Sequence, residues 1–273
     1  MIQLEHISFW YKRRGELFKD VTFKQETGSI VGLFGENGAG KSSLLYLISG
    51  LIQPKTGHIH VNGHVPFERT PDFLSDIFLV TDTPFLPTIS ISAYIKVYAP
   101  LYKNFDLEKM HQILPQFKLD MQDKLNSLSS GQQKKFIIAF ALATNCKLLL
   151  FDEPTNGLDI QSKSMFRKLL VSSIEKDQLV LISTHQVKDI ETIIDKIVIL
   201  EKGQILFEKN VIEVTEKIQF KTAPLLSSVA NVLYHEKCPE GFKVILSSED
   251  HKETAVDIEL LFNALTNKTT LNF

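Results

Sequence analysis

Short apolar runs alternate with helical stretches along most of this chain. The run 29–34 is followed by a polar, glycine-rich loop and then by the apolar stretch 43–48, which predicts a buried strand, a turn and a helix. The runs 77–80, 148–151 and 179–182 predict three more short buried strands. Because buried strands that alternate with helices are typical of parallel sheets, the pattern favours an α/β fold.

Antiparallel elements are predicted at both ends of this α/β region. Residues 1–23 have the alternation of strands around a charged turn at 12–16. The stretch 57–65 predicts a hairpin with an Asn-Gly pair as its turn, and 197–207 predicts a closing hairpin. We therefore expect an antiparallel β part beside the main sheet.

The middle of the chain predicts a helical part at about 84–145. From 89 to 125 the apolar positions recur at helical spacing behind Asp106, a candidate N-cap. We expect this apolar stripe to pack against other elements; it comprises Leu107, Met110, Ile113, Leu114 and Phe117.

The pattern changes beyond about residue 216. Short strands are predicted at 229–234 and 242–246, and a helix at 257–265. This stretch holds no group of residues that suggests chemistry, so we expect a small α+β appendage at 216–273, used for contacts or regulation, behind a main domain at 1–215.

A complete G-x-x-x-x-G-K-[ST] sequence lies between the first predicted strand and helix, the context that a phosphate-binding loop requires. Its glycines let backbone N–H groups face phosphates, Lys41 can reach the outer phosphates, and the Ser42 hydroxyl can ligate Mg²⁺. The Lys-Ser pair and both flanks favour this interpretation over a glycine turn without a ligand. The candidate phosphate-binding residues are Gly35, Glu36, Asn37, Gly38, Ala39, Gly40, Lys41, Ser42 and Ser43.

Polar side chains follow two other predicted strands. Asp152 and Glu153 come directly after 148–151, and His185 follows 179–182. The carboxyl ends of parallel strands are where open α/β sheets bind ligands. One acid can hold Mg²⁺ and the other can polarise water.

Aromatic and histidine residues elsewhere have two interpretations each. Tyr11 precedes the phosphate-binding loop and either stacks on a purine or packs at a strand edge. His58 and His60 share a face of an alternating strand, but no cysteine or carboxylate joins them at ligand spacing, so an exposed strand face is favoured over a metal site.

Composition narrows the classes of partner. The chain has 273 residues, 44% of them hydrophobic, and a formal net charge of −2, which gives no electrostatic case for nucleic acid. With two cysteines we expect no disulfide framework and a reducing compartment. Residues 1–6 lack the pattern of a signal peptide, and no apolar run is long enough to span a bilayer, so we expect membrane contact only through partner chains.

These motifs occur together, and in this order, in the ATP-binding cassette (ABC) ATPases. The resemblance runs from about residue 1 to 216: 35–42 resembles the Walker A loop, 128–132 the signature sequence, 148–153 Walker B with its trailing glutamate, and 157–159 the D-loop. His185 resembles the switch histidine. Taken alone, 128–132 would indicate only a serine-capped helix start.

The resemblance implies a P-loop NTPase core with an antiparallel β subdomain and a helical subdomain, and a role for each matching residue. Tyr11 would stack on adenine, Asp152 would hold Mg²⁺ through water, and Glu153 would act as general base. His185 would contact the γ-phosphate and link two subunits. The residues implied to serve the nucleotide of the other subunit are Ser129, Gly131 and Gln132.

Two positions depart from the family pattern. Ser130 replaces the first glycine of the signature, a small change that we expect to be tolerated. Asp82 stands where the family has the Q-loop glutamine. An aspartate can still ligate Mg²⁺, but it adds negative charge facing the γ-phosphate.

The resemblance implies an ATP-binding and ATP-hydrolysing subunit of an ABC transporter, expected to be an exporter. It would use ATP and Mg²⁺, form a homodimer or heterodimer of ATPase subunits, and pair with transmembrane permease subunits. We expect a cytoplasmic protein, peripheral on the cytoplasmic face of the membrane. The alternative is a soluble ABC ATPase without a transport role, for example in cofactor assembly. A P-loop GTPase is disfavoured, because the only Asn-Lys pair, at 267–268, lacks the acid of a guanine reader.

Overall fold

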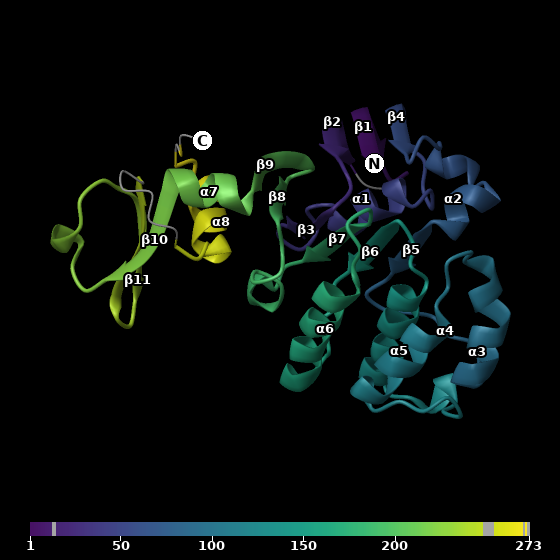
Figure 1. Cartoon of the computed structure of the whole chain (residues 1–273). Helices are drawn as coiled ribbons and strands as arrows, with labels where there is room; N and C mark the ends of the chain where they lie inside the picture. Colours follow the sequence, from purple (N-terminus) through teal and green to yellow (C-terminus); the bar gives the residue numbers. More distant parts are fainter. Residues whose placement is uncertain (13–14, 248–253, 270, 272–273) are drawn as a thin grey trace.

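A six-stranded mixed sheet forms the centre of the computed structural model, which describes residues 1–12, 15–247, 254–269 and 271 (Figure 1). Its strand order is β5-β6-β7-β3-β8-β9, parallel except for β9. The strands are β3 (Ser29–Phe34), β5 (Ile77–Val80), β6 (Leu148–Asp152), β7 (Leu179–Thr184), β8 (Lys196–Glu201) and β9 (Gln204–Asn210). The four strands predicted from apolar runs and the closing hairpin are therefore confirmed, as is the α/β fold.

Both faces of this sheet are covered. Leu149 and Phe151 of β6 enter one apolar cluster, together with α5 (Ser130–Ala143) and α6 (Ile160–Ser173). Their neighbours Leu148 and Leu150 enter a second cluster on the other side, which includes α1 (Lys41–Ile48). Because side chains alternate along a strand, a strand buried on both faces is apolar throughout, which explains the continuous runs in the sequence.

A separate antiparallel sheet of order β2-β1-β4 packs into the second cluster. It consists of β1 (Ile2–Trp10), β2 (Glu16–Gln25) and β4 (Thr56–Val61). Positions 13 and 14 of the predicted charged turn lie outside the described residues. The predicted Asn-Gly turn is confirmed, since Asn62 and Gly63 have positive φ and Val61 and His64 exchange two backbone hydrogen bonds across it. The predicted returning strand of the hairpin is wrong, because pairing stops at this single bridge and β4 pairs with β1. His58 is exposed, and no metal-binding group of side chains occurs among the described residues.

The middle of the chain is helical, and its helices lie together at the lower right of Figure 1. They are α3 (Ile91–Tyr98), α4 (Leu107–Ile113) and α5, while the short α2 (Pro71–Ser75), which precedes them, lies higher at the right of the picture. Asp106 caps α4 as expected, since its carboxylate accepts the Lys109 N–H at 2.9 Å. The expected stripe is buried except for Leu107, which is 45% exposed because it lies in the first turn, on the outer side of the helix. The bounds of this part, 84–145, stay a prediction.

The C-terminal elements form a third group, at the left of Figure 1. They are α7 (Val211–Lys217), β10 (Ile218–Ala223), β11 (Val232–Cys238), β12 (Gly241–Ser247) and α8 (Ile258–Thr266), with sheet order β10-β12-β11. The sequence did not indicate α7 or β10, and the expected boundary at 215/216 falls inside α7. Among the described residues, no helix combines the length and apolar character that crossing a membrane requires.

Candidate functional site

The glycine-rich loop joins β3 to α1, and two of its glycines stand where a larger residue has no room. Gly40 has a φ of 110°, and a Cβ there would stand 2.8 Å from two ring carbons of Phe18. A Cβ on Gly35 would collide with the carbonyl oxygen of Leu200. Within the described residues no side chain caps α1, so its first amide groups stay available to an anion.

Lys41 is folded back onto this loop. Its ammonium donates to the carbonyl oxygens of Gly35, at 2.7 Å, and Glu36, at 3.2 Å, and lies 3.8 Å from the Glu153 carboxylate. Burial lowers the pKa of Lys41, while the charges of Glu153 and Asp152 oppose that shift. Lys41 is only 7% exposed. Its positive charge therefore lies buried beside the glycine-rich loop, where it would attract a phosphate bound by that loop.

Asp152 presents a buried carboxylate to the hydroxyl of Ser42. Ser42 Oγ donates to Asp152 Oδ1 at 3.0 Å, and Ser183 Oγ donates to the same oxygen at 2.5 Å. Burial raises the pKa of Asp152; the two hydroxyl hydrogen bonds oppose the rise, and the charges of Glu153 and Asp82 add to it. Adjacent hydroxyl and carboxylate oxygens are the ligands that Mg²⁺ prefers, so these two residues fit that ion.

Glu153 is held in an unusual backbone conformation. Its φ is 47°, in the left-handed region that non-glycine residues rarely adopt, and its N–H donates to Ser183 O at 2.9 Å. Thr184 Oγ1 donates to Oε2 at 3.0 Å. Oε1 accepts the His185 backbone N–H at 3.1 Å and lies 2.8 Å from His185 Nδ1. Three groups of one strand end thus fix the orientation of this carboxylate.

Asp82 reaches the same region from the loop after β5. Its Oδ1 lies 2.9 Å from the Lys134 ammonium and accepts the Asn156 Nδ2–H at 3.1 Å. The metal role expected of Asp82 stays a prediction.

One cavity of about 320 Å³ brings many of these residues together. Tyr11 forms one wall: its hydroxyl lies 3.0 Å from Ser43 Oγ, and its ring packs edge-on against Phe9 with centroids 4.8 Å apart. Other lining residues are Asn37, Gly38, Gly40, Lys41, Ser42, Ser43, Asp82 and Glu153. Among the described residues that line this cavity, none belongs to the signature segment.

The signature segment begins α5. Ser129 Oγ accepts the Gln132 N–H at 3.3 Å, and the Gln132 side chain accepts the Ser129 N–H at 3.0 Å, which is a capping box. Gly131 lies against the D-loop, where an added Cβ would stand 3.3 Å from Gly157 O. Ser129 is exposed, so the segment faces solvent in this single chain.

Comparison with known proteins decides the family. The family model described as ABC transporter matches residues 18–156. The molybdate import ATP-binding protein MolC of Haemophilus influenzae is 32% identical over 209 residues, which are 76% of this chain and 81% of MolC. The chain belongs to the ABC transporter family. The predicted membership of the ABC ATPases, the predicted fold class and the predicted ATPase class are thereby confirmed. Proteins of this family bind ATP through the domain found here.

Two further likenesses support this result. The SkfA peptide export ATP-binding protein SkfE of Bacillus subtilis is 27% identical over 229 residues, covering 81% of this chain and 94% of SkfE. The dimeric ATP-binding cassette MJ0796, solved in a post-hydrolysis state with ADP and Pi, has the same fold, with a TM-score of 0.68 at 24% identity over 77% of this chain and 98% of that one.

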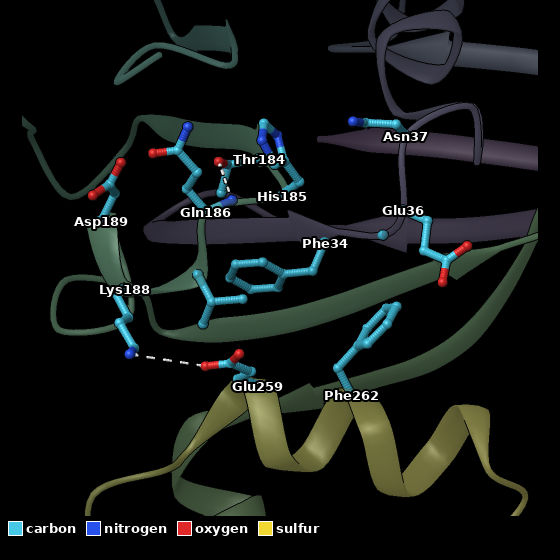
Figure 2. A pocket seen from close by; sticks show the side chains of 12 residues that line it. Phe34, Glu36, Asn37, Thr184, His185, Gln186, Lys188, Asp189, Glu259 and Phe262 are labelled. Carbon is cyan, nitrogen blue, oxygen red and sulfur yellow. Dashed lines mark hydrogen bonds and ion pairs between the residues drawn. The ribbon is translucent and has the colours of Figure 1, made fainter. Parts of the chain in front are cut away.

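A second cavity, of about 580 Å³, is lined by His185 (Figure 2). His185 and Asn37 stand on one side of it, and Phe34 and Phe262 face each other across it. Gly35 and Glu36 also line it. Phe262 belongs to α8, so the C-terminal part of the chain borders the residues that follow β7.

Sequence reasoning missed several residues of this site. Ser183 and Thr184 were passed over as neighbours of His185, although each donates to one of the two acids. Lys134 was missed too: a lysine next to an apolar run looks like a solvated residue, yet it is 4% exposed.

Proposed function

We propose that this chain is the ATP-hydrolysing subunit of a transporter and that it drives separate membrane subunits. The observation that carries the proposal is the position of Glu153: its carboxylate lies 3.8 Å from the phosphate-loop lysine and is oriented by His185 at 2.8 Å. A base beside a phosphate-binding cation is the arrangement that hydrolysis of a phosphoanhydride needs.

In this proposal each part of the cavity has one task. Tyr11 stacks on the adenine, and the backbone amides of 35–43 surround the phosphates. Lys41 leaves the two loop carbonyls and pairs with the β- and γ-phosphates. Ser42 and Asp152 hold Mg²⁺, which supplies positive charge to the phosphate oxygens when it is bound.

The reaction is a displacement by water at the γ-phosphorus. Glu153 accepts a proton from the attacking water as the new oxygen–phosphorus bond forms. The bond from the γ-phosphorus to the bridging oxygen breaks, and that oxygen leaves on ADP. Phosphate is the other product, and no oxidant or reductant is needed.

The signature segment indicates that the complete site needs a second ATPase subunit. Ser129, Gly131 and Gln132 lie outside the cavity of their own chain, and Ser129 is exposed. In the proposed head-to-tail dimer they reach the nucleotide bound to the other subunit, whether that subunit is a second copy or a related chain. The dimeric state of MJ0796 supports this arrangement.

A groove next to Asp82 suits a helix from a membrane subunit. It has a volume of about 660 Å³ and lies between the helical part and the central sheet. Phe85 on its rim is 98% exposed, and Leu101 is 61% exposed. Together with the apolar residues that line the groove, they form a continuous apolar surface, and such surfaces mark interaction sites. We place the protein at the cytoplasmic face of the membrane, held there by permease subunits.

Export is the proposed direction. SkfE, named for peptide export, is matched over 94% of its length at 27% identity, and MolC, named for molybdate import, over 81% at 32% identity; the proposal follows the fuller match in length. Loading of everted membrane vesicles that contain the whole transporter distinguishes the two directions, since an exporter accumulates its substrate inside them.

Affinity purification from solubilised membranes tests the transport role. We expect the tagged chain to bring down a polytopic membrane protein, and Phe85→Ser to lose that protein while it keeps its ATPase rate. Val171→Ser, which changes a 56% exposed valine on α6, is the matched control and should retain the partner. Recovery of the tagged chain with soluble proteins alone would favour the alternative role in cofactor assembly.

A further inference from the structure

A buried lysine connects the signature helix to the hydrolytic centre. Lys134 lies in the second turn of α5 and is 4% exposed, although the family resemblance assigned it no role. Lysine is almost never fully buried unless its ammonium is paired. The partners of this ammonium therefore indicate what the residue does.

All three ammonium protons of Lys134 have acceptors, and the acceptors come from two other segments. Nζ donates to Asp82 Oδ1 at 2.9 Å, to the Glu153 carbonyl oxygen at 3.1 Å and to the Asn156 carbonyl oxygen at 2.9 Å. Asn156 Nδ2 closes the network by donating to the same Asp82 oxygen at 3.1 Å. A lysine ammonium has three donors, so this one is fully satisfied.

Two of these acceptors belong to the turn that carries the proposed base. Glu153 has a φ of 47°, a conformation that a non-glycine residue keeps only when its surroundings fix it. Its N–H is held by Ser183 O, and its C=O is held by Lys134. The peptide on each side of Glu153 is thus fixed by a different element, β7 on one side and α5 on the other.

We propose that Lys134 is a positioning residue for Glu153 and that Asp82 is its counter-charge. This inference rests on the proposed ATPase site. It also explains the acid at the Q-loop position: the negative charge of Asp82 is balanced inside the protein by the lysine. Displacement of α5 would then move the backbone of Glu153 directly.

Steady-state ATP hydrolysis of Lys134→Met, of the wild type and of Glu153→Gln tests the proposal. A base moved by about 1 Å loses up to about 100-fold in rate, so we expect kcat to fall roughly 10- to 100-fold. KM for ATP should not change, because Lys134 does not line the nucleotide cavity. Lys134→Arg, which keeps the charge, should recover most of the rate.

Two further variants make the test specific. Lys135→Met removes the neighbouring lysine, whose partner is Asp159 at 3.2 Å, and should keep the wild-type kcat. Because a network that acts as a unit gives non-additive losses, Asp82→Asn combined with Lys134→Met should be no slower than Lys134→Met alone. If thermal unfolding shows that Lys134→Met does not fold, Lys134→Gln takes its place, and the same changes in kcat and KM are expected of it.

The outcomes separate this inference from the proposed function. Wild-type kcat in Lys134→Met, a rise in KM alone, or additive losses in the double variant would overturn the role of Lys134 and leave the ATPase intact. Absence of hydrolysis in the wild type, equal to Glu153→Gln, would instead overturn the proposed function itself.

Discussion

At the scale of single residues, the site brings buried groups of opposite charge close together: the Lys41 ammonium lies 3.8 Å from the Glu153 carboxylate. The Lys41 ammonium donates to two backbone carbonyls, and the buried Asp152 carboxylate accepts from two hydroxyl groups. The shifts follow from burial: it lowers the pKa of Lys41 and raises the pKa of Asp152. Each group therefore gains when a partner of opposite charge arrives, which favours binding of a metal and a phosphate together.

Asp152→Asn should stabilise the protein in the absence of nucleotide. A carboxyl with a pKa raised by folding binds its proton more tightly in the folded chain, so the folded state loses stability as pH rises through that range. Near neutral pH the buried charge is a cost that asparagine removes. We expect the melting temperature to rise by roughly 2–4 °C, the shift that about 1 kcal/mol gives in a chain of this size.

The gain from Asp152→Asn should shrink as the pH is lowered, because the wild-type carboxyl then takes up its proton. Added Mg²⁺ and ATP should stabilise the wild type but not the variant. Scanning fluorimetry over a pH series measures both effects, and a lower melting temperature for the variant at neutral pH contradicts the assigned charge of Asp152.

His185→Ala should lower turnover with little loss of nucleotide affinity. The imidazole lies 2.8 Å from Glu153 Oε1 and is one of three groups that orient this carboxylate, so its removal loosens the base, and we expect kcat to fall by about 100-fold. A fluorescent ATP analogue measures affinity, and phosphate release measures turnover. His58→Ala, an exposed histidine on β4, is the control. Wild-type turnover in His185→Ala would remove this histidine from the site.

At the scale of elements, the sequence predicted what depends on one segment and missed what depends on contacts between segments. β3, β5, β6 and β7 were predictable because strands buried on both faces are continuously apolar. The Asn-Gly turn after β4 was predicted correctly, but the strand expected after it was not formed, since the chain continues into a loop beyond the Val61–His64 bridge.

Interactions between distant segments escaped prediction for a physical reason. Asp82 and Lys134 are 52 positions apart, and only the packing of α5 on the central sheet brings them together. The position of Asp152 and Glu153 at the end of a strand was predictable from the sequence. The left-handed backbone of Glu153 and the three donors to its carboxylate were not. These features depend on β7, a strand that follows Glu153 in the chain.

Ser129→Ala tests whether the Ser129 hydroxyl has two roles, as the cap of α5 and as a contact to the nucleotide of the other subunit. Loss of the cap of α5 should cost about 1 kcal/mol of stability. It should also weaken ATP-dependent dimerisation, because the same hydroxyl is proposed to face the nucleotide of the other subunit. Asp106→Ala removes the cap of α4 at a similar cost and should leave dimerisation unchanged. Equal dimerisation in the two variants would contradict the second use of Ser129.

At the scale of the whole molecule, one chain holds half of each proposed site. The cavity at Tyr11 and Lys41 contains the phosphate loop and the base, while the signature segment of the same chain faces solvent. The C-terminal helix α8 borders the cavity behind His185 (Figure 2), so a subunit that docks there meets both parts of the chain. In the proposed head-to-tail dimer, closure of two chains around ATP would complete two sites at once.

The molecular mass of Glu153→Gln in solution, with and without Mg²⁺ and ATP, tests the central claim most directly. The variant keeps the phosphate loop, Ser42 and Asp152 but lacks the base, so bound ATP persists and holds two chains together. Light scattering after size exclusion should give the mass of one chain without nucleotide and of two chains with it. A single-chain mass in both conditions, with no nucleotide retained, would contradict the proposed sandwich.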